Sequence, residues 1–303
     1  MMADVAVVVP TYNRLATLPA SIASLLAQEG VALEVVVVDD GSTDGTAEWL
    51  RGLGDPRVRA IVGAHGGIAA ARNAGLAAVR TPFVAFHDSD DLALPGRLAT
   101  PVRYLRAHPD VHLVIQNGRM LPPEDGGGEE EPWIRPAVAR TLAARPIGVA
   151  EVFRWNLGQL QGMCFTAEAL RAVGPFDGSF RILDDLDLVL RVAARFPAVF
   201  LDEPAFAYRR HAGGVARDRV TVREESIRLA DKLAAESPHV LDLVGPGVFA
   251  RRQARRYARL AAVRARAGDA CGARAALARA RALHPASLRY RLQALWLALR
   301  VRP

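Results

Sequence analysis

The sequence predicts an α/β domain built on a doubly wound, mostly parallel sheet, followed by a helical carboxyl-terminal extension. Short apolar runs alternate with longer helical patterns in the first part of the chain, and these runs are apolar at nearly every position, as in strands buried on both faces. Beyond about residue 220 the pattern is helical throughout. With 303 residues, 51% of them hydrophobic, the chain can bury a sizeable core.

The expected elements alternate strictly along the chain. Strands are expected at residues 5–9, 34–38, 58–62, 83–86 and 111–116, and helices near residues 17–28, 46–51, 68–80 and 97–107. The strands are rich in Val, Ile and Phe, which favour extended structure. After a mixed segment that reaches residue 180, a helix near 184–195 and a short strand near 198–201 complete the domain.

Charge separates the chain into two domains, residues 1–219 and residues 220–303. The first carries 22 basic and 26 acidic side chains, a net charge of −4, and the second carries 17 and 6, a net charge of +11. The basic domain suits an anionic membrane surface, and a solvated arginine-rich helical face explains it equally well. No aromatic or motif signature of nucleic-acid binding accompanies the charge, so nucleic acid is not an expected partner.

Large apolar residues near the carboxyl end fall on one helical face. They are Leu288, Leu292, Leu295, Trp296 and Leu299. Packing onto the first domain or onto a second copy of the chain in an oligomer would bury this face. Peripheral contact with a membrane is the sharper hypothesis.

The amino terminus predicts a cytoplasmic chain, because it lacks a positive signal region and the apolar run 5–9 is too short to span a membrane. Lipid binding by the basic domain would place the chain at the inner face of the plasma membrane. Residues 122–132 are rich in Gly and Glu and predict a flexible acidic loop, either a solvated insertion or a lid over a site.

Polar and glycine-rich segments follow the ends of four expected strands. They are residues 10–14, 39–42, 63–67 and 87–91. In a doubly wound sheet the ligand crevice lies beyond the carboxyl ends of the strands. We therefore expect these segments to meet at one edge of the sheet and to carry the chemistry.

Two groups of carboxylates stand at these strand ends. Asp39 and Asp40 follow one strand, and Asp88, Asp90 and Asp91 follow another. Clustered carboxylates repel one another unless a cation lies among them, and oxygen ligands suit Mg²⁺ or Mn²⁺. One such pair alone is more simply a helix cap, but two pairs at corresponding strand ends favour a metal and diphosphate site.

A third acidic group, Asp184, Asp185 and Asp187, opens the helix near 184–195. Acids in a first helical turn are stabilised by the helix dipole, which explains them without a function. If the chain folds back toward the crevice, Asp185 is suited to remove a hydroxyl proton as a general base. His211 is a candidate metal or phosphate ligand, although a lone His is usually neither.

These motifs together resemble family 2 of the inverting glycosyltransferases, which have the GT-A fold. The matching stretches, in order, are residues 7–14, 36–46, 67–75, 88–91, 173–177, 184–188 and 208–211. They cover about residues 4–212. The resemblance implies an enzyme of hexosyltransferase type that takes a nucleotide-sugar donor, with a UDP-sugar favoured, and a glycan or lipid-linked acceptor in polysaccharide or glycoconjugate synthesis.

The resemblance also assigns roles to individual positions. The donor-binding positions are Pro10, Thr11, Tyr12, Asn13, Asp40, Arg72 and Asp88. Asp90, Asp88 and His211 match positions near the metal, and Asp185 matches the general base. Gly162, Met163 and Asp184 match the stretches around the donor-sugar and acceptor pocket. Asp91 is expected to be a neighbouring structural acid, and Leu186 stands where the family often has Trp.

Two other classes of protein share some of these features. A sugar-nucleotide pyrophosphorylase should have a glycine-rich phosphate loop with Arg and Lys after the first strand, where this chain has residues 10–13, Pro-Thr-Tyr-Asn. A non-catalytic nucleotide-sugar or carbohydrate-binding protein would not need the base Asp185. Donor turnover measured with and without EDTA separates these alternatives from a glycosyltransferase.

Overall fold

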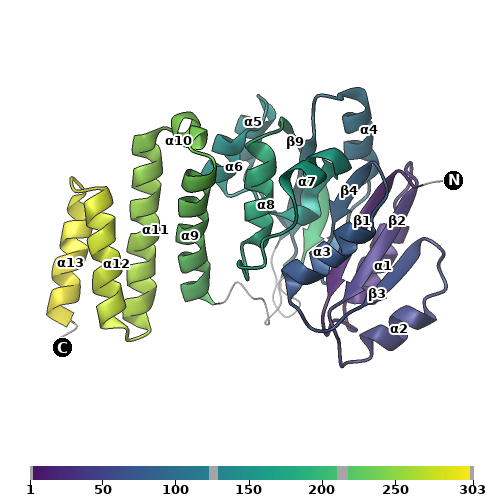
Figure 1. Ribbon diagram of the computed structural model, residues 1–303, viewed down its shortest axis with the longest axis horizontal. Coiled ribbons are helices and arrows are strands. Elements are labelled where there is room, and N and C mark those ends of the chain that lie inside the picture. Colours follow the sequence, from purple (N-terminus) through teal and green to yellow (C-terminus); the bar gives the residue numbers. More distant parts are fainter. Residues whose placement is uncertain (1–2, 123–128, 210–217, 301–303) are drawn as a thin grey trace. The chain divides into compact units, whose positions relative to one another are not determined.

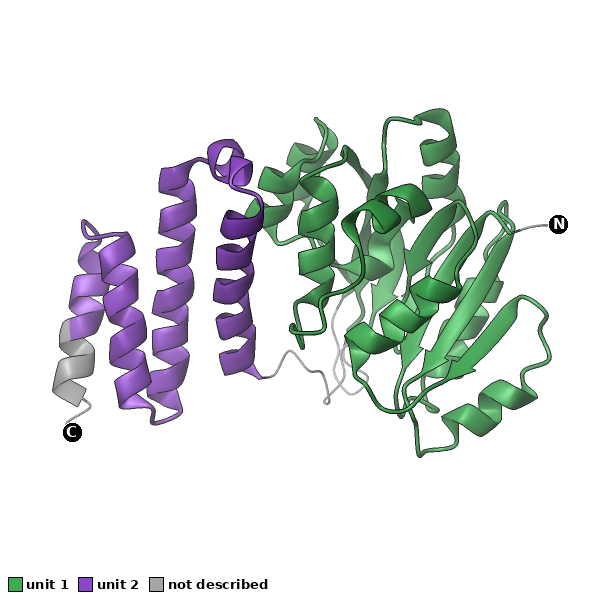
Figure 2. Cartoon of the chain, viewed as in Figure 1, with its two compact units in different colours: residues 1–212 green, residues 213–303 purple. Residues whose placement is uncertain are grey.

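The computed structural model describes residues 3–122, 129–209 and 218–300, with side chains described as far as residue 294. Its contacts divide the chain into two compact units, Met1–Ala212 and Gly213–Pro303 (Figure 2). All strands that the structure describes belong to unit 1, and the described part of unit 2 is helical.

Unit 1 is built on one nine-stranded sheet (Figure 1). Its strands are β1 (Val5–Thr11), β2 (Leu33–Asp39), β3 (Val58–Val62), β4 (Phe83–Phe86), β5 (Leu92–Ala93), β6 (Leu113–Met120), β7 (Glu131–Pro132), β8 (Met163–Thr166) and β9 (Ala198–Tyr208). They lie in the order β3-β2-β1-β4-β8-β6-β9-β5, with β7 paired to β6. Strands β1 to β4, β6 and β9 run in one direction, so the expected mostly parallel sheet is confirmed.

Helices cover both faces of this sheet, as the continuous apolar strands predict. Those of unit 1 are α1 (Leu18–Leu26), α2 (Thr46–Gly52), α3 (Ile68–Ala78), α4 (Ala99–Ala107), α5 (Pro136–Ala143), α6 (Val149–Trp155), α7 (Ala167–Val173) and α8 (Asp184–Ala193), with a short 3₁₀ turn η1 (Leu160–Gly162). Val7 of β1 packs in the core with α1 and α4. Its neighbour Val8 faces α3, where a Cβ on Gly75 would come within 2.4 Å of its side chain. Glycine at position 75 therefore permits the close packing of α3 on the sheet.

Several strands differ from the sequence-based expectation. β6 and β9 extend to Met120 and Tyr208, because they pair with each other in parallel through register shifts at residues 116–118. The strand β8 lies in the segment for which no element was expected, and it inserts antiparallel between β4 and β6. Glu131–Pro132 of the expected acidic loop pairs with β6 as β7, and residues 123–128 of that loop lie outside the described residues.

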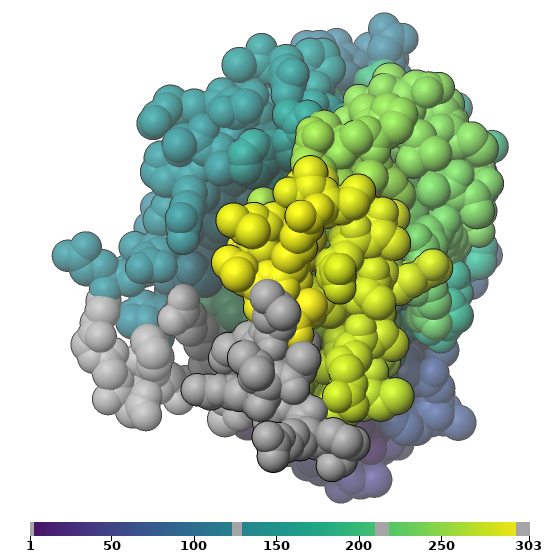
Figure 3. All heavy atoms as spheres, turned by 90° about the vertical axis from the view of Figure 1, so that its left-hand side faces the viewer, coloured from purple at the N-terminus to yellow at the C-terminus, as the bar shows by residue number. Residues whose placement is uncertain are grey.

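Unit 2 consists of α9 (Arg219–Glu236), α10 (His239–Val244), α11 (Pro246–Arg266), α12 (Ala270–Leu283) and α13 (Leu288–Arg300). Figure 3 shows the face on which α13 lies beside α12. Alanines dominate its core, where Ala258 and Ala261 of α11 meet Ala273 and Ala276 of α12. No helix among the described residues is both long and apolar enough to cross a membrane.

Candidate active site

The acidic turn at residues 88–91 follows directly on β4, at the carboxyl end of the parallel strands. The amide of Asp91 donates to the carbonyl of Asp88 over 3.2 Å, which closes the turn. Helix α1 supports it from behind, because Thr17 Oγ1 donates to the carbonyl of Ser89 at 3.0 Å and Ser21 Oγ to that of Asp88 at 3.3 Å. The backbone of the turn is therefore held in place by α1.

Arg72, in the first turns of α3, joins two of the predicted acidic groups. Its Nη1 lies 2.8 Å from Asp184 Oδ2 and its Nη2 lies 3.2 Å from Asp88 Oδ1. Arg72 and Asp184 are almost fully buried, at 5% and 1% exposure. This pairing shows that α8 folds back to the acidic turn after β4, which the sequence alone did not establish.

The ring of Phe176 holds Arg72 from another side, with the guanidinium carbon 5.6 Å from the ring centroid. The Asn73 side chain fixes the backbone of Phe176, because it accepts from the Phe176 amide at 2.8 Å and donates to the Phe176 carbonyl at 3.0 Å. Both residues lie in motif stretches, but only the structure shows why they occur together. Phe176 is thus a site residue that the sequence-based prediction did not include.

Asp185 lies half-buried at the start of α8, next to Asp184. Burial and the neighbouring Asp184 charge raise the pKa of Asp185 to about 7, although Arg72 opposes the shift. A carboxylate with a pKa near neutrality can accept a proton at working pH far better than an ordinary aspartate. The raised pKa therefore suits the role of general base that the sequence predicted for Asp185.

The acids of the turn have different surroundings. Asp90 Oδ2 pairs with Arg14 Nε at 3.2 Å and its side chain is 17% exposed. The Asp88 side chain is 31% exposed, and burial raises its pKa despite the nearby guanidinium of Arg72. Asp88 and Asp90 are thus partly exposed acids, each paired with an arginine.

Asp91 is 1% exposed and its carboxylate binds within the protein. It accepts from Gln161 Nε2 at 2.8 Å and from the amide of Arg209 at 3.2 Å. Burial and the charges of Asp88 and Asp90 raise its pKa to about 8. Asp91 therefore ties the acidic turn to η1 and to the end of β9, a structural role.

The ends of β1 and β2 carry the other residues that were predicted to bind the donor. Both oxygens of Asp40 accept backbone hydrogen bonds, from Gly66 at 2.8 Å and from Gly67 at 2.9 Å, so the carboxylate holds the loop before α3. Asn13, in the left-handed region at φ 51°, accepts from the Thr43 amide at 2.8 Å. The described bonds of these two predicted donor-binding residues thus order the loops of the site.

Tyr12 is the exposed member of this group, and its ring stacks on His65 with centroids 4.2 Å apart. Pro10 and Thr11 are buried at the end of β1, and Thr11 Oγ1 has no hydrogen-bond partner among the described residues. His65 is a second residue that the sequence-based prediction did not name. Its position in the loop after β3 was the available signal, because that loop was expected at the crevice.

Three of the other predicted residues, Gly162, Met163 and Asp184, are buried and line no open pocket in the part of the chain that the structure describes. Met163 is fully buried in β8, so its side chain does not line an open pocket in this structure. Gly162 is also buried, and a Cβ there would come within 2.7 Å of the Gln116 carbonyl, so glycine is required by packing. Asp184 is held inside the protein by Arg72 rather than exposed on a pocket wall. His211 lies outside the described residues.

Comparison with known proteins is consistent with this geometry. The family described as Glycosyl transferase family 2 matches residues 6–147, which contain β1 to β4, Arg72 and the acidic turn. This part of the chain is therefore similar to glycosyl transferase family 2. Its matched region ends before Asp185, so the second half of the site rests on the structure.

Two curated relatives match different lengths of this chain. The succinoglycan biosynthesis protein ExoO of Rhizobium meliloti (strain 1021) is 49% identical over 96 residues, 31% of this chain and 28% of that protein. An uncharacterized glycosyltransferase of Nostoc sp. is 28% identical over 211 residues, 68% of this chain and 65% of that protein. The chain thus spans less than two thirds of the length of either relative.

Solved structures share the fold of this chain. S. aureus TarS 1-349 in complex with UDP has a TM-score of 0.63 at 17% identity, over 97% of this chain and 88% of that one. The mannosyltransferase PcManGT from Pyrobaculum calidifontis, in complex with GDP-Man and Mn²⁺, has a TM-score of 0.61 at 21% identity, over 98% and 85%. The expected GT-A fold is confirmed.

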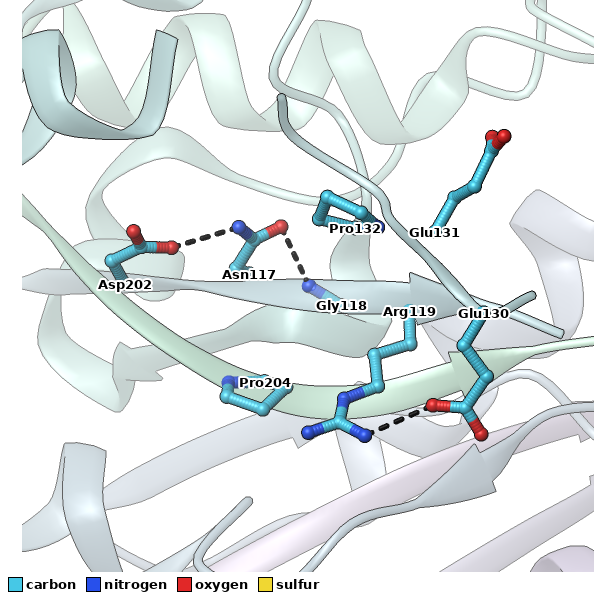
Figure 4. Close-up of a pocket in the computed structure, with 8 residues that line it drawn as sticks. All are labelled: Asn117, Gly118, Arg119, Glu130, Glu131, Pro132, Asp202 and Pro204. Carbon is cyan, nitrogen blue, oxygen red and sulfur yellow. Dashed lines mark hydrogen bonds and ion pairs between the residues drawn. The ribbon is translucent and has the colours of Figure 1, made fainter. Parts of the chain in front are cut away.

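A cavity of about 340 Å³ opens between β6, β7 and β9 (Figure 4). Its polar side chains bind one another: Asn117 Nδ2 donates to Asp202 Oδ1 at 2.8 Å, and Arg119 pairs with Glu130 at 2.9 Å. Phe206 separates it from the Gly162 stretch, since a Cβ on either Gly118 or Gly162 would meet this ring. None of the residues of the acidic turn lines this cavity.

Proposed function

We propose that this chain transfers a sugar from a nucleoside-diphosphate donor to an acceptor hydroxyl in polysaccharide or glycoconjugate synthesis. The observation that carries the proposal is the bridge made by Arg72 between Asp88 and Asp184, beside Asp185. It brings a cation suited to diphosphate, the acids of the turn after β4 and a base with a raised pKa into one crevice. The curated relatives and the printed names of the solved structures support the same class of reaction.

The reaction that this arrangement supports is a single in-line displacement with inversion at the anomeric carbon. Asp185 takes the proton of the acceptor hydroxyl as that oxygen bonds to the sugar, and the bond between the sugar and the diphosphate breaks. For this transfer Asp185 must come within about 3 Å of the acceptor oxygen. Arg72 is buried beside Asp88. Its positive charge stabilises the negative charge that develops on the leaving diphosphate.

The crevice also fits a divalent cation. Mg²⁺ and Mn²⁺ prefer oxygen ligands and are commonly held by one or two carboxylates together with substrate phosphates and water. Asp90 and Asp88 offer such oxygens at the mouth of the crevice. The bound cation would neutralise charge on the diphosphate. No set of three or more His, Cys, Asp or Glu ligands is assembled among the described residues, so the donor phosphates would complete the site.

Replacing Asp90 with Ala is expected to weaken donor binding only when a divalent cation is present. Calorimetry of UDP and GDP binding with Mn²⁺ and with EDTA measures this effect. We expect the variant to lose about 10-fold or more in Mn²⁺-dependent affinity, because metal sites lose 10- to 100-fold when a supporting group is removed. Unchanged Mn²⁺-dependent binding would show that Asp90 does not hold the cation.

Transfer is expected to fall as the pH drops below about 7. The pKa of Asp185 is raised to about 7, so its proton-accepting form predominates only above that pH. A rate profile from pH 5.5 to 9 should therefore rise with pH on its acid side, with a midpoint near 7. A flat profile between pH 6 and 8 would be incompatible with Asp185 as the base.

We further propose that unit 2 contacts an anionic membrane that carries the acceptor. Leu288 and Leu292 lie one turn apart on α13 and are 67% and 57% exposed, with Arg289 and Arg291 exposed beside them. An apolar stripe flanked by arginines is typical of helices that lie in a lipid interface. Tyr290 of the same helix is buried in the core of unit 2.

The chain should therefore float with vesicles that contain phosphatidylglycerol and not with purely zwitterionic ones. Replacing Leu288 and Leu292 together with Glu should abolish flotation, because two charges would enter the interface. Arg274→Gln, on the neighbouring helix α12, is the control and should reduce binding only slightly. Equal flotation with both kinds of vesicle would rule out docking, and concentration-dependent sedimentation of the wild type would assign the face to an oligomer.

A further inference from the structure

Arg97 is fully buried between the acidic turn and the core, and it is not part of the site as described above. It lies at the end of the turn that follows β5, with its amide donating to the Leu94 carbonyl at 3.1 Å. Its Nη2 donates to three backbone carbonyls: Met163 at 2.7 Å, Phe86 at 3.3 Å and Leu160 at 3.4 Å. Its Nε and Nη1 have no hydrogen-bond partner among the described residues.

The three carbonyls mark the place where β4 and β8 separate. The antiparallel pairing of these strands ends at Ala85 and Cys164. The next residue on each strand, Phe86 and Met163, would continue the ladder, but their carbonyls accept from Arg97 instead. Arg97 thus supplies a side-chain donor to the carbonyls of Phe86 and Met163, just beyond the end of the β4–β8 pairing.

The segments that Arg97 holds apart both continue into the candidate active site. Phe86 is followed by His87 and then by the acidic turn, whereas Leu160 begins η1, from which Gln161 donates to Asp91. A guanidinium between these segments therefore fixes the distance between the turn and η1. Movement of either segment would change the position of Asp88 relative to Asp185.

Burying this cation is costly, because no described carboxylate pairs with it. Taking an unpaired charge out of water costs several kcal/mol even after relaxation. Burial lowers the pKa of Arg97 to about 10, so the group remains charged at neutral pH. Burial and the charge of Arg97 also lower the pKa of His87 to about 3, which keeps that imidazole neutral. An apolar side chain of similar volume would fill the same space at a lower cost in free energy.

Arg191 offers a comparison within the same unit. It also donates to three backbone carbonyls, those of Val173, Gly174 and Pro175, but it pairs with Asp187 at 2.8 Å. The carbonyls that it bonds belong to the last residue of α7 and the two residues after it, not to Phe86, Leu160 or Met163. Arg191 thus shares the three carbonyl bonds of Arg97 but differs from it in its carboxylate partner and its location.

We propose that Arg97 is a positioning residue for glycosyl transfer, which sets the separation of the acidic turn from η1 by bonding the carbonyls of Phe86, Leu160 and Met163. The proposal rests on the function proposed above. Arg97 is fully buried and does not touch substrate. Its effect on transfer is exerted through the positions of Asp88 and Asp91.

The test compares Arg97→Met and Arg97→Lys with Arg191→Lys. We expect Arg97→Met to lower kcat by about 100-fold with little change in donor KM, because a misplacement of about 1 Å can cost that much. Arg97→Lys keeps the charge and one carbonyl bond, so it should recover part of the lost kcat. Arg191→Lys should lower the melting temperature but leave kcat within about twofold of the wild type.

The wild type and Asp185→Asn are measured in the same series, so that a failure of the proposed function is seen separately. No turnover by the wild type with any donor would overturn the function. Normal turnover in the wild type together with an unchanged kcat in folded Arg97→Lys and Arg97→Met would overturn the role of Arg97 alone. If Arg97→Met does not fold, the Lys variant decides: a kcat that falls no more than in Arg191→Lys at equal stability contradicts the proposal.

Discussion

Asp185→Asn is expected to bind nucleotide-sugar donor as the wild type does and to transfer about 100- to 10,000-fold more slowly, the range that general base catalysis contributes. The amide has the size of the carboxylate but cannot accept the acceptor proton. Transfer measured by release of nucleotide, with donor binding measured by calorimetry, separates the two effects.

The free energy of unfolding shows whether Asp185→Asn loses transfer because it lacks the base or because it unfolds. The folded-state pKa of Asp185 is raised to about 7, so above its ordinary pKa the ionised side chain disfavours the folded state. The Asn variant should therefore be no less stable than the wild type at pH 8. Asp187→Asn, on the same helix but paired with Arg191, is the matched control, and it should lose stability and keep the transfer rate per folded molecule. A normal transfer rate in Asp185→Asn would refute the assignment of the base.

Arg72→Met is expected to have the largest effect on stability, lowering the free energy of unfolding by about 3–5 kcal/mol. The substitution leaves the buried carboxylate of Asp184 without its cation, and urea denaturation measures the loss. It should also abolish transfer, because the crevice loses the cation closest to Asp88. Adding Asp184→Asn in the same chain should restore part of the stability, since the uncompensated charge is then removed.

The control for Arg72 is an exposed ion pair. Arg51 pairs with Glu48 at 3.1 Å with both side chains largely exposed, so Arg51→Met should cost at most about 1 kcal/mol. Equal losses in Arg72→Met and Arg51→Met would mean that the buried bridge does not hold the site together.

The part of the site that the sequence predicts best is the part that follows from strand ends. The apolar runs before Asp40 and Asp88 are short, β-branched or aromatic and bounded by polar residues, so their ends could be located along the chain. The rule that ligands lie beyond the carboxyl ends of parallel strands then places both acids in one crevice. The structure brings these strand ends together as expected.

The contacts of Arg72 could not be obtained in this way. Its partner Asp184 lies 112 residues further along the chain, and nothing local to either residue specifies the pairing. The insertion of β8 was missed for a similar reason, because its four residues gain their strand partners only from β4 and β6. β9 was expected to end at residue 201, since Asp202, Glu203 and Pro204 are unfavourable in strands, but the bulged pairing with β6 carries the strand past them.

The most direct test of the central claim is the configuration of the sugar when it first leaves the donor. Slow donor hydrolysis, with water in place of the acceptor, can be followed by proton NMR before the free sugar mutarotates. A single displacement assisted by Asp185 predicts that an α-linked UDP-sugar or GDP-sugar releases the β-anomer first, and that Asp185→Asn releases almost none. Initial release of the α-anomer, or equal hydrolysis by the Asn variant, would contradict it.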